Sequence, residues 1–367
     1  MRIKFLKNEY DPFIDYLKGI SIIFVVWTHC IPRDELSNIL FPFWGDTAVP
    51  LFLLIQTFHC YKKDTAKMPS FKKLWKRIIL PYLIFLFFMF AFDYLIYYKD
   101  TSGQFNLSLY WDNRGPGSYY IFVYLQFAFL LPLIHPILRH FSLKWLCLIF
   151  VIISLLIEYL IFMTHCPDAV YRITFFRYFF LIYLGYFIAK DGIPVNTMTI
   201  FISLISMAFI YFFNYTTFDW GHLFCINYPY WRSCHWICYP YIAILYIWLL
   251  RFIYNKSNNP IKVGIQLFGK YSYEIYLFQM FYFAIISRYV KLVMPGLGLI
   301  TNEIVSIVIS TMICITPSII RYYIDRRHWP PQNEDRKVQA YMHLFPYPDT
   351  IRMDDLSIIT ILCPTLL

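Results

Sequence analysis

The sequence predicts an all-α, polytopic membrane protein with about ten transmembrane helices. Three observations predict this class. Of the 367 residues, 59% are hydrophobic and only 15% are charged, which is too apolar for a soluble globular domain. Apolar runs of about 20 residues, enough to cross a bilayer, recur along the chain with short polar stretches between them. The loops between the runs alternate between rich and poor in Lys and Arg, as membrane orientation requires.

The apolar runs place the helices in order, because each run is bounded by charges or by Pro, Gly or Asn. The expected spans are 14–31, 44–60, 77–98, 118–137, 145–163, 173–190, 197–214, 236–254, 271–290 and 299–320. Gly45 and Pro50 interrupt the second span, which is typical of a partly re-entrant segment. Residues 322–367 contain prolines among mixed charges. We therefore expect a transmembrane domain over 1–321 and a cytoplasmic tail over 322–367.

Basic residues indicate which side of the membrane each loop occupies. The amino terminus and the loops after every second span hold most of the Lys and Arg outside the apolar runs, including seven between Lys62 and Arg77. The other loops hold one or two each. Because basic loops stay in the cytoplasm, both termini are expected there. The net charge of +10 is thus topological, and it forms no continuous basic face of the kind that binds nucleic acid.

The first helix carries ionisable residues where lipid makes them costly. Asp15, Lys18 and His29 lie in an otherwise apolar segment, and such residues pair, face the protein interior or serve a function. From Lys18 to His29 an α-helix turns to within about 20° of alignment and rises about 16 Å, while Asp15 is close enough to pair with Lys18. One interpretation is an interfacial ion pair and a histidine at a helix end. The other is a cationic site with a general base, because histidine accepts protons near neutral pH.

A second basic cluster precedes the third span, within FKKLWKRIILPY. Its members are Lys72, Lys73, Lys76 and Arg77. Spacings of three and four residues predict that the last three share one helix face. Topology or anionic lipid headgroups account for most clusters of this kind. The alternative is a phosphate clamp, which suits coenzyme A because that molecule is cytoplasmic and carries phosphates.

Six segments form an ordered series over most of residues 11 to about 320. The first, DYLKGISIIFVVWTHC, holds a basic residue, ten further residues and a histidine, here Lys18 and His29. The others are GDTAVPLFLLIQTF, KRIILPY, GSYYIFVYLQFAFLLPLI, RYFFLIYLGYFIAK and GKYSYEIYLFQ. Together they resemble the acyltransferase-3 family of integral membrane O-acyltransferases, which acylate surface polysaccharides, peptidoglycan and small acceptors.

The resemblance implies a reaction and a site. We expect an O-acyltransferase of the bacterial inner membrane that moves an acyl group, most simply acetyl, from cytoplasmic acyl-CoA to a hydroxyl of a surface polysaccharide or similar acceptor. Acyl-CoA would be the co-substrate, with no bound cofactor or metal. His29 would be the catalytic base. The residues expected to bind acyl-CoA are Lys18, Lys73, Lys76, Arg77 and Arg177. An alternative role for Arg177 is that of a buried cation paired with Glu158.

The sequence departs from the family pattern in three places. The residues Ile55–Phe58 replace the usual Phe-x-Ser-Gly-Phe ending, and Gln279 stands where the family often has His. The Arg-x-x-Arg entry to the third helix is lysine-rich here. Lysine keeps the charge but lacks the bidentate fork of arginine. Which of the basic residues takes that role therefore stays open.

Two other functions fit parts of the pattern. Asp15, Lys18 and His29 form a polar stripe on one face of the first helix. Ten helices with such a stripe also describe a transporter or flippase of a glycan or lipid-linked substrate, although the sequence lacks the internal repeat common in such folds. A catalytically silent relative acting as a scaffold is the other alternative. Outer-loop cysteines leave a disulfide open, between members of the set Cys166, Cys225, Cys234 and Cys238. Together with His222 and His235, the last three match no usual zinc spacing.

Overall fold

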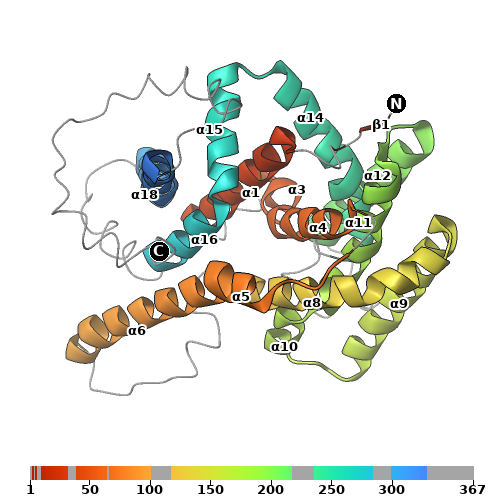
Figure 1. The fold of residues 1–367 in the computed structure, drawn as a ribbon, viewed down its shortest axis with the longest axis horizontal. Coiled ribbons are helices and arrows are strands. Elements are labelled where there is room, and N and C mark those ends of the chain that lie inside the picture. The colour runs from red at the N-terminus through yellow and green to blue at the C-terminus, as the bar shows by residue number, and fades with distance from the viewer. Residues whose placement is uncertain are drawn as a thin grey trace.

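The computed structural model describes residues 2–3, 5, 10–31, 39–63, 66–100, 117–216, 235–283 and 299–328, and these residues are mostly helical (Figure 1). Two short strands, β1 (Arg2–Ile3) and β2 (Ile193–Pro194), pair antiparallel. The helical elements are α1 (Pro12–Cys30), α3 (Phe41–Trp44), α4 (Ala48–Tyr61), α5 (Phe71–Leu74), η2 (Trp75–Ile79), α6 (Leu80–Asp100), α8 (Tyr119–His140), α9 (Leu143–Met163), α10 (Asp168–Ile173), η3 (Phe175–Tyr178), α11 (Phe179–Asp191), α12 (Thr197–Tyr215), η5 (Trp236–Cys238), η6 (Tyr241–Tyr246), α14 (Ile247–Lys256), α15 (Asn259–Lys270), α16 (Ser272–Phe281) and α18 (Leu299–His328). Of these, η2 and η6 are π-helices, and η3 and η5 are 3₁₀ turns.

Each of the ten expected spans overlaps helix in the part of the chain that the structure describes. Seven helical stretches there are long and apolar enough to cross a membrane: Pro12–Cys30, Phe71–Ala91, Tyr119–His140, Leu143–Met163, Thr197–Tyr215, Trp236–Lys256 and Val305–Asp325. The predicted class is therefore confirmed, and the chain is an all-α, multi-pass membrane protein. The expected interruption of the second span is present at Gly45, since a turn over Gly45–Thr47 separates α3 from α4, but Pro50 lies inside the first turn of α4, where proline is tolerated, and does not interrupt it. The predicted domain boundary after residue 321 lies inside α18.

The longest described helix that lies between the expected spans is α15, and α10 is a shorter one. The sequence assigns residues 255–270 to a basic loop, but the structure has α15 there, starting with a proline in its first turn, where proline is favoured. The sequence prediction was wrong because 12 residues are too few to span a bilayer, so the segment gave no transmembrane signal. A short helix is marginally stable by itself, and packing of its apolar side stabilises it. For α15 the packing partner is α1.

Helix α1 connects two hydrophobic cores formed by the residues that the structure describes. Its first half contributes Phe13 and Leu17 to a core shared with α4, α8, α9 and α11. Its second half contributes Ile22 and Val26 to a core shared with α16 and α18. Figure 1 shows α1 near the middle of the molecule, with α15 crossing it and α3 and α4 beside it. Polar residues on α1 are thus fixed relative to helices from both halves of the chain.

The loops predicted to lie on the basic side gather at one end of the helices. Strand β1, from the amino terminus, pairs with β2, which follows α11. Phe5 packs against Phe58 near the end of α4, with 4.9 Å between ring centroids. Tyr271, between α15 and α16, donates a hydrogen bond of 2.9 Å to Asp325 near the end of α18, and α15 ends against the first turns of α1. Alternate loops therefore share one end, as the prediction requires, and the cytoplasmic location of that end stays a prediction.

Candidate functional site

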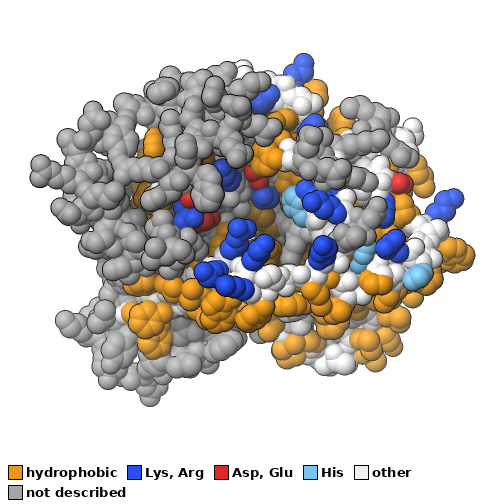
Figure 2. Space-filling view, viewed as in Figure 1, with side chains coloured by type: hydrophobic (Ala, Val, Ile, Leu, Met, Phe, Trp, Pro, Cys, Tyr) orange, Lys and Arg blue, Asp and Glu red, His pale blue; other side chains and the backbone are white. Residues whose placement is uncertain are grey.

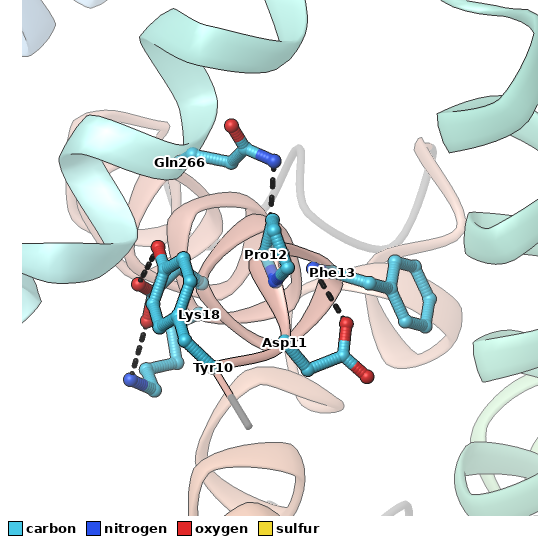
Figure 3. A network of polar contacts seen from close by, with 7 residues as sticks. Tyr10, Asp11, Pro12, Phe13, Lys18 and Gln266 are labelled. Atoms are coloured by element: carbon cyan, nitrogen blue, oxygen red, sulfur yellow. Dashed lines mark hydrogen bonds and ion pairs between the residues drawn. The ribbon is translucent and has the colours of Figure 1, made fainter. Parts of the chain in front are cut away.

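The first turns of α1 hold a network of polar side chains (Figure 3). Asp11 caps the helix. Lys18 Nζ donates to Asp15 Oδ1 at 2.7 Å, and Tyr10 Oη donates to the other carboxylate oxygen of Asp15 at 2.6 Å. The predicted pairing of Asp15 with Lys18 is confirmed. The side chain of Lys18 remains 25% exposed, so its ammonium group is oriented by Asp15 and still accessible to a further anion.

His29 lies in the last turn of the same helix, at the opposite end of the stripe. It is half-buried, and its ring centroid is 5.7 Å from that of Phe283, just beyond α16. Trp27 Nε1 donates to Thr311 Oγ1 at 3.1 Å and thereby ties this end of α1 to α18. Because α1 is α-helical throughout, Lys18 and His29 lie on nearly the same face, about 16 Å apart along the axis.

The second basic cluster is exposed at the start of the third span and comprises Lys72, Lys73, Lys76 and Arg77. One expectation is corrected here. From Trp75 to Ile79 the helix is a π-helix, so the α-helical spacing used to place the cluster on one face does not apply across η2. Such wider turns occur often at functional sites. Tyr273 Oη donates to the carbonyl of Ile78 at 2.6 Å, which fixes η2 against the start of α16.

Figure 2 shows a face of the molecule that includes α5. Lys and Arg side chains gather over α5 and surround a depression between α5 and α15, in which acidic and histidine side chains are also visible. The floor of the depression is hydrophobic. A polar entrance above an apolar floor is a suitable arrangement for an anionic molecule with an extended, less polar arm.

Helix α4 brings two further basic residues to Lys18, and the sequence analysis missed both. His59 and Lys62 lie at the end of α4, and each interacts electrostatically with Lys18. His59 also interacts with Asp15. The run of basic residues at the end of the second family-like segment was the only available signal. That these basic residues lie close to Lys18 depends on how α1 packs against α4.

Arg177 lies in a different environment from the other predicted donor-binding residues. It is only 2% exposed and interacts electrostatically with Glu158 of α9 and Tyr171 of α10. Tyr171 Oη donates to Glu158 Oε1 at 2.6 Å, and Tyr239 Oη donates to the carbonyl of Arg177 at 2.9 Å. These contacts fit the alternative role of a buried cation beside Glu158. A role in the donor path remains a proposal.

Three of the family-like segments each contribute a tyrosine to a group beside α1. We call Tyr82, Tyr120 and Tyr276 the tyrosine group. Tyr276 Oη donates to the carbonyl of Gly117 at 2.8 Å, and its ring lies 5.5 Å from that of Tyr120. Tyr82 belongs to the same core, which includes the middle of α1. The side-chain amide of Gln279, where the family often has His, is buried near Gly117. The segments therefore line the part of α1 that lies between its two polar ends.

Other predicted features fall outside the described residues. Cys225, Cys234 and His222 are among them. The outer-loop disulfide therefore stays a prediction, as does the interpretation of the histidines and cysteines around it.

Comparison with known proteins identifies the region that contains this site. A family model described as an acyltransferase domain, of the acyltransferase-3 type, matches residues 11–322. No curated protein and no solved structure matches the chain. The matched region begins at the cap of α1 and ends within α18. It therefore includes the stripe on α1, the basic residues around Lys18, the basic cluster of α5 and η2, and the tyrosine group.

Proposed function

The chain belongs to the acyltransferase-3 family of multi-pass membrane proteins, and from this premise we propose that it transfers an acyl group from cytoplasmic acyl-CoA to a hydroxyl of a surface glycan or similar acceptor. Acetyl-CoA is the proposed donor, and the bacterial inner membrane is the proposed location. The observation that carries the proposal is the arrangement of α1. One rigid helix presents a cation, Lys18, at one end and a histidine, His29, at the other.

The donor half of the proposal rests on charge. Coenzyme A is polyanionic, and the exposed basic side chains gather around one depression (Figure 2). Lys18, Lys73, Lys76 and Arg77 are the proposed contacts for its phosphates. The long arm of the donor would then extend past the tyrosine group toward His29. In this arrangement the acyl group crosses much of the bilayer while it is still attached to the thiol.

The acceptor half of the proposal rests on one base. His29 takes the proton of the acceptor hydroxyl as the oxygen attacks the thioester carbonyl. The C–S bond of the resulting tetrahedral intermediate breaks, and the coenzyme A thiolate leaves and receives the proton from the imidazolium. Direct transfer needs only positioning and this base. The reaction is complete in this single transfer, without an acyl-enzyme intermediate.

Membrane vesicles containing the protein test this function. Radiolabelled acetyl-CoA is supplied on the cytoplasmic side, and label is measured in the extracted glycan fraction together with thiol release. We expect covalent label with wild-type protein and none above background with His29→Ala. Full transfer by folded His29→Ala would eliminate the proposed mechanism. Movement of a glycan across the vesicle membrane without incorporated label would instead identify a transporter or flippase.

A further inference from the structure

Two basic clusters from separate segments lie on one face of the molecule. The first contains Lys18 from α1 with His59 and Lys62 from the end of α4, and we call it the α1–α4 cluster. The second is the α5–η2 cluster of Lys72, Lys73, Lys76 and Arg77. The two are linked by packing, because η2 is bonded to α16 and α15 ends against the first turns of α1. Lys18 and Lys62 supply the positive charge of the first cluster, to which His59 adds a ring N–H donor. Two cationic sites at fixed separation suit a ligand with two separate anionic groups.

Coenzyme A is such a ligand, since it carries a diphosphate and a separate 3′-phosphate on its ribose. The diphosphate joins the nucleotide to the pantetheine arm, so it must lie where that arm enters the membrane domain. The 3′-phosphate lies on the nucleotide side and can remain at the surface. The site for the diphosphate should therefore lie deeper in the protein than the site for the 3′-phosphate.

The α1–α4 cluster meets the requirement for the diphosphate. Lys18 stands on the helix that leads to His29, and Tyr10 and Asp15 hold it in position. Lys18 and Lys62 are half-buried, with His59 exposed one turn of α4 before Lys62, whereas Lys73, Lys76 and Arg77 are all exposed. We propose that Lys18, His59 and Lys62 bind the diphosphate of acyl-CoA, and that the α5–η2 cluster binds its 3′-phosphate. This assignment rests on the proposed function and adds His59 and Lys62 to the donor site.

The charges around Lys62 support an anion site. Burial and then the neighbouring Lys63 lower the pKa of Lys62; Asp11 opposes this, and Lys18 lowers the pKa further. Like charges held close together repel one another, and a bound anion relieves that repulsion. Asp15 supplies one negative charge to the cluster, which is shared with Lys18. The three lysines at this site, Lys18, Lys62 and Lys63, outnumber the two carboxylates, Asp11 and Asp15, so positive charge remains for the diphosphate.

Equilibrium binding to purified protein in detergent tests the assignment without requiring transfer. The probes are radiolabelled acetyl-CoA and acetyl-3′-dephospho-CoA, which lacks only the 3′-phosphate. For wild-type protein we expect Kd to be about tenfold higher for the dephospho probe, the effect of losing charge-assisted contacts. The double variant K73Q/R77Q should bind both probes with nearly equal Kd. The double variant H59Q/K62Q should raise Kd about tenfold for both probes and keep their ratio.

Lys144→Gln provides the matched control, because Lys144 is exposed in the first turn of α9, at an end predicted to lie on the same side, and belongs to neither cluster. It should change neither Kd, and the thermal unfolding midpoint of every variant shows whether it is folded. A lost ratio in H59Q/K62Q with a retained ratio in K73Q/R77Q would reverse the assignment and so overturn it. Unchanged Kd in folded H59Q/K62Q would also overturn it. If wild-type protein binds neither probe, the proposed function itself fails, which is a distinct outcome.

Discussion

Gly269 of α15 lies directly against the backbone carbonyl of Asp15 in α1. The relationship is reciprocal, because Gly19 of α1 lies against the carbonyl of Ile265 in α15. A Cβ atom at either glycine would overlap the facing backbone, so only glycine permits this approach. Small residues are typical of close helix contacts in membranes. The contact holds α15 beside the turn that carries the Asp15–Lys18 ion pair.

Gly269→Ala should destabilise the protein, because the added methyl group forces α1 and α15 apart. We expect a cost of about 1–3 kcal/mol, typical of overpacking, together with weaker binding of acetyl-CoA as the Lys18 region shifts. Gly264→Ala is the control in the same helix, since no atom lies within 4 Å of the added Cβ there. It should stabilise the helix by about 0.5–1 kcal/mol. Thermal unfolding in detergent measures both, and equal midpoints for the two variants would contradict the close contact.

Glu158 and Arg177 should behave as a coupled buried pair. Removing one charge leaves the other buried without its compensation, so we expect about 3–5 kcal/mol of destabilisation from Glu158→Gln or Arg177→Met alone. The double variant should lose much less than the sum of the two. Unfolding midpoints of the two single variants and the double variant measure the coupling. Additive losses would indicate that the two side chains act independently.

The same variants distinguish the two roles of Arg177. If it is a structural cation, the double variant Glu158→Gln with Arg177→Met should recover both stability and the Kd for acetyl-CoA. If Arg177 contacts the acyl donor, stability should recover while acetyl-CoA binding or transfer remains impaired. Binding and transfer assays on the same preparation separate these outcomes.

His29 should be replaceable by a soluble base if it acts through proton transfer. His29→Ala should lower kcat by about 10²–10⁴-fold with little change in KM for acetyl-CoA, because the donor phosphates are held at the other end of α1. Added imidazole should restore part of the rate in a concentration-dependent way. His29→Gln, which fills the space without supplying a base, should show no such restoration. Equal responses of the two variants would assign His29 a packing role beside Phe283.

Tyr276→Phe should weaken the contact between α16 and the start of α8. The change removes the hydrogen bond to the carbonyl of Gly117, so we expect a loss of about 1 kcal/mol or more in a buried setting. Tyr159→Phe makes the same chemical change at an exposed position of α9 and should leave the unfolding midpoint unchanged. A larger effect at Tyr159 would contradict the packing described for the tyrosine group.

The stripe on α1 was predictable because it depends on a single helix. Once residues 14–31 are assigned to an α-helix, the rise and turn per residue determine the relation between Lys18 and His29. The ion pair with Asp15 follows from a spacing of three residues. The π-helix at η2 shows the limit of this argument, since a local change of helix type alters the angles between residues that the sequence places on one face.

The remaining site residues depend on packing between segments far apart in the chain. His59 and Lys62 approach Lys18 only because α4 packs against α1, and no sequence spacing encodes that distance. Arg177 has a family-like local sequence, yet Glu158 and Tyr171 on other helices decide its surroundings. Helix α15 gave no signal because it is too short to cross a bilayer, and its place is determined by glycines that contact another backbone.

The sequence by itself therefore determined the class of protein, the order of its helices and the two ends of the polar stripe on α1. These features depend on composition, on apolar runs of bilayer length and on the geometry of one helix, all of which are local properties. Only the tertiary structure decided which basic residues surround Lys18, which helix supports it and where Arg177 lies. Those relations arise from contacts between side chains and backbones of different helices. Such contacts depend on how the helices fit together in three dimensions, and they leave no periodic pattern in the sequence.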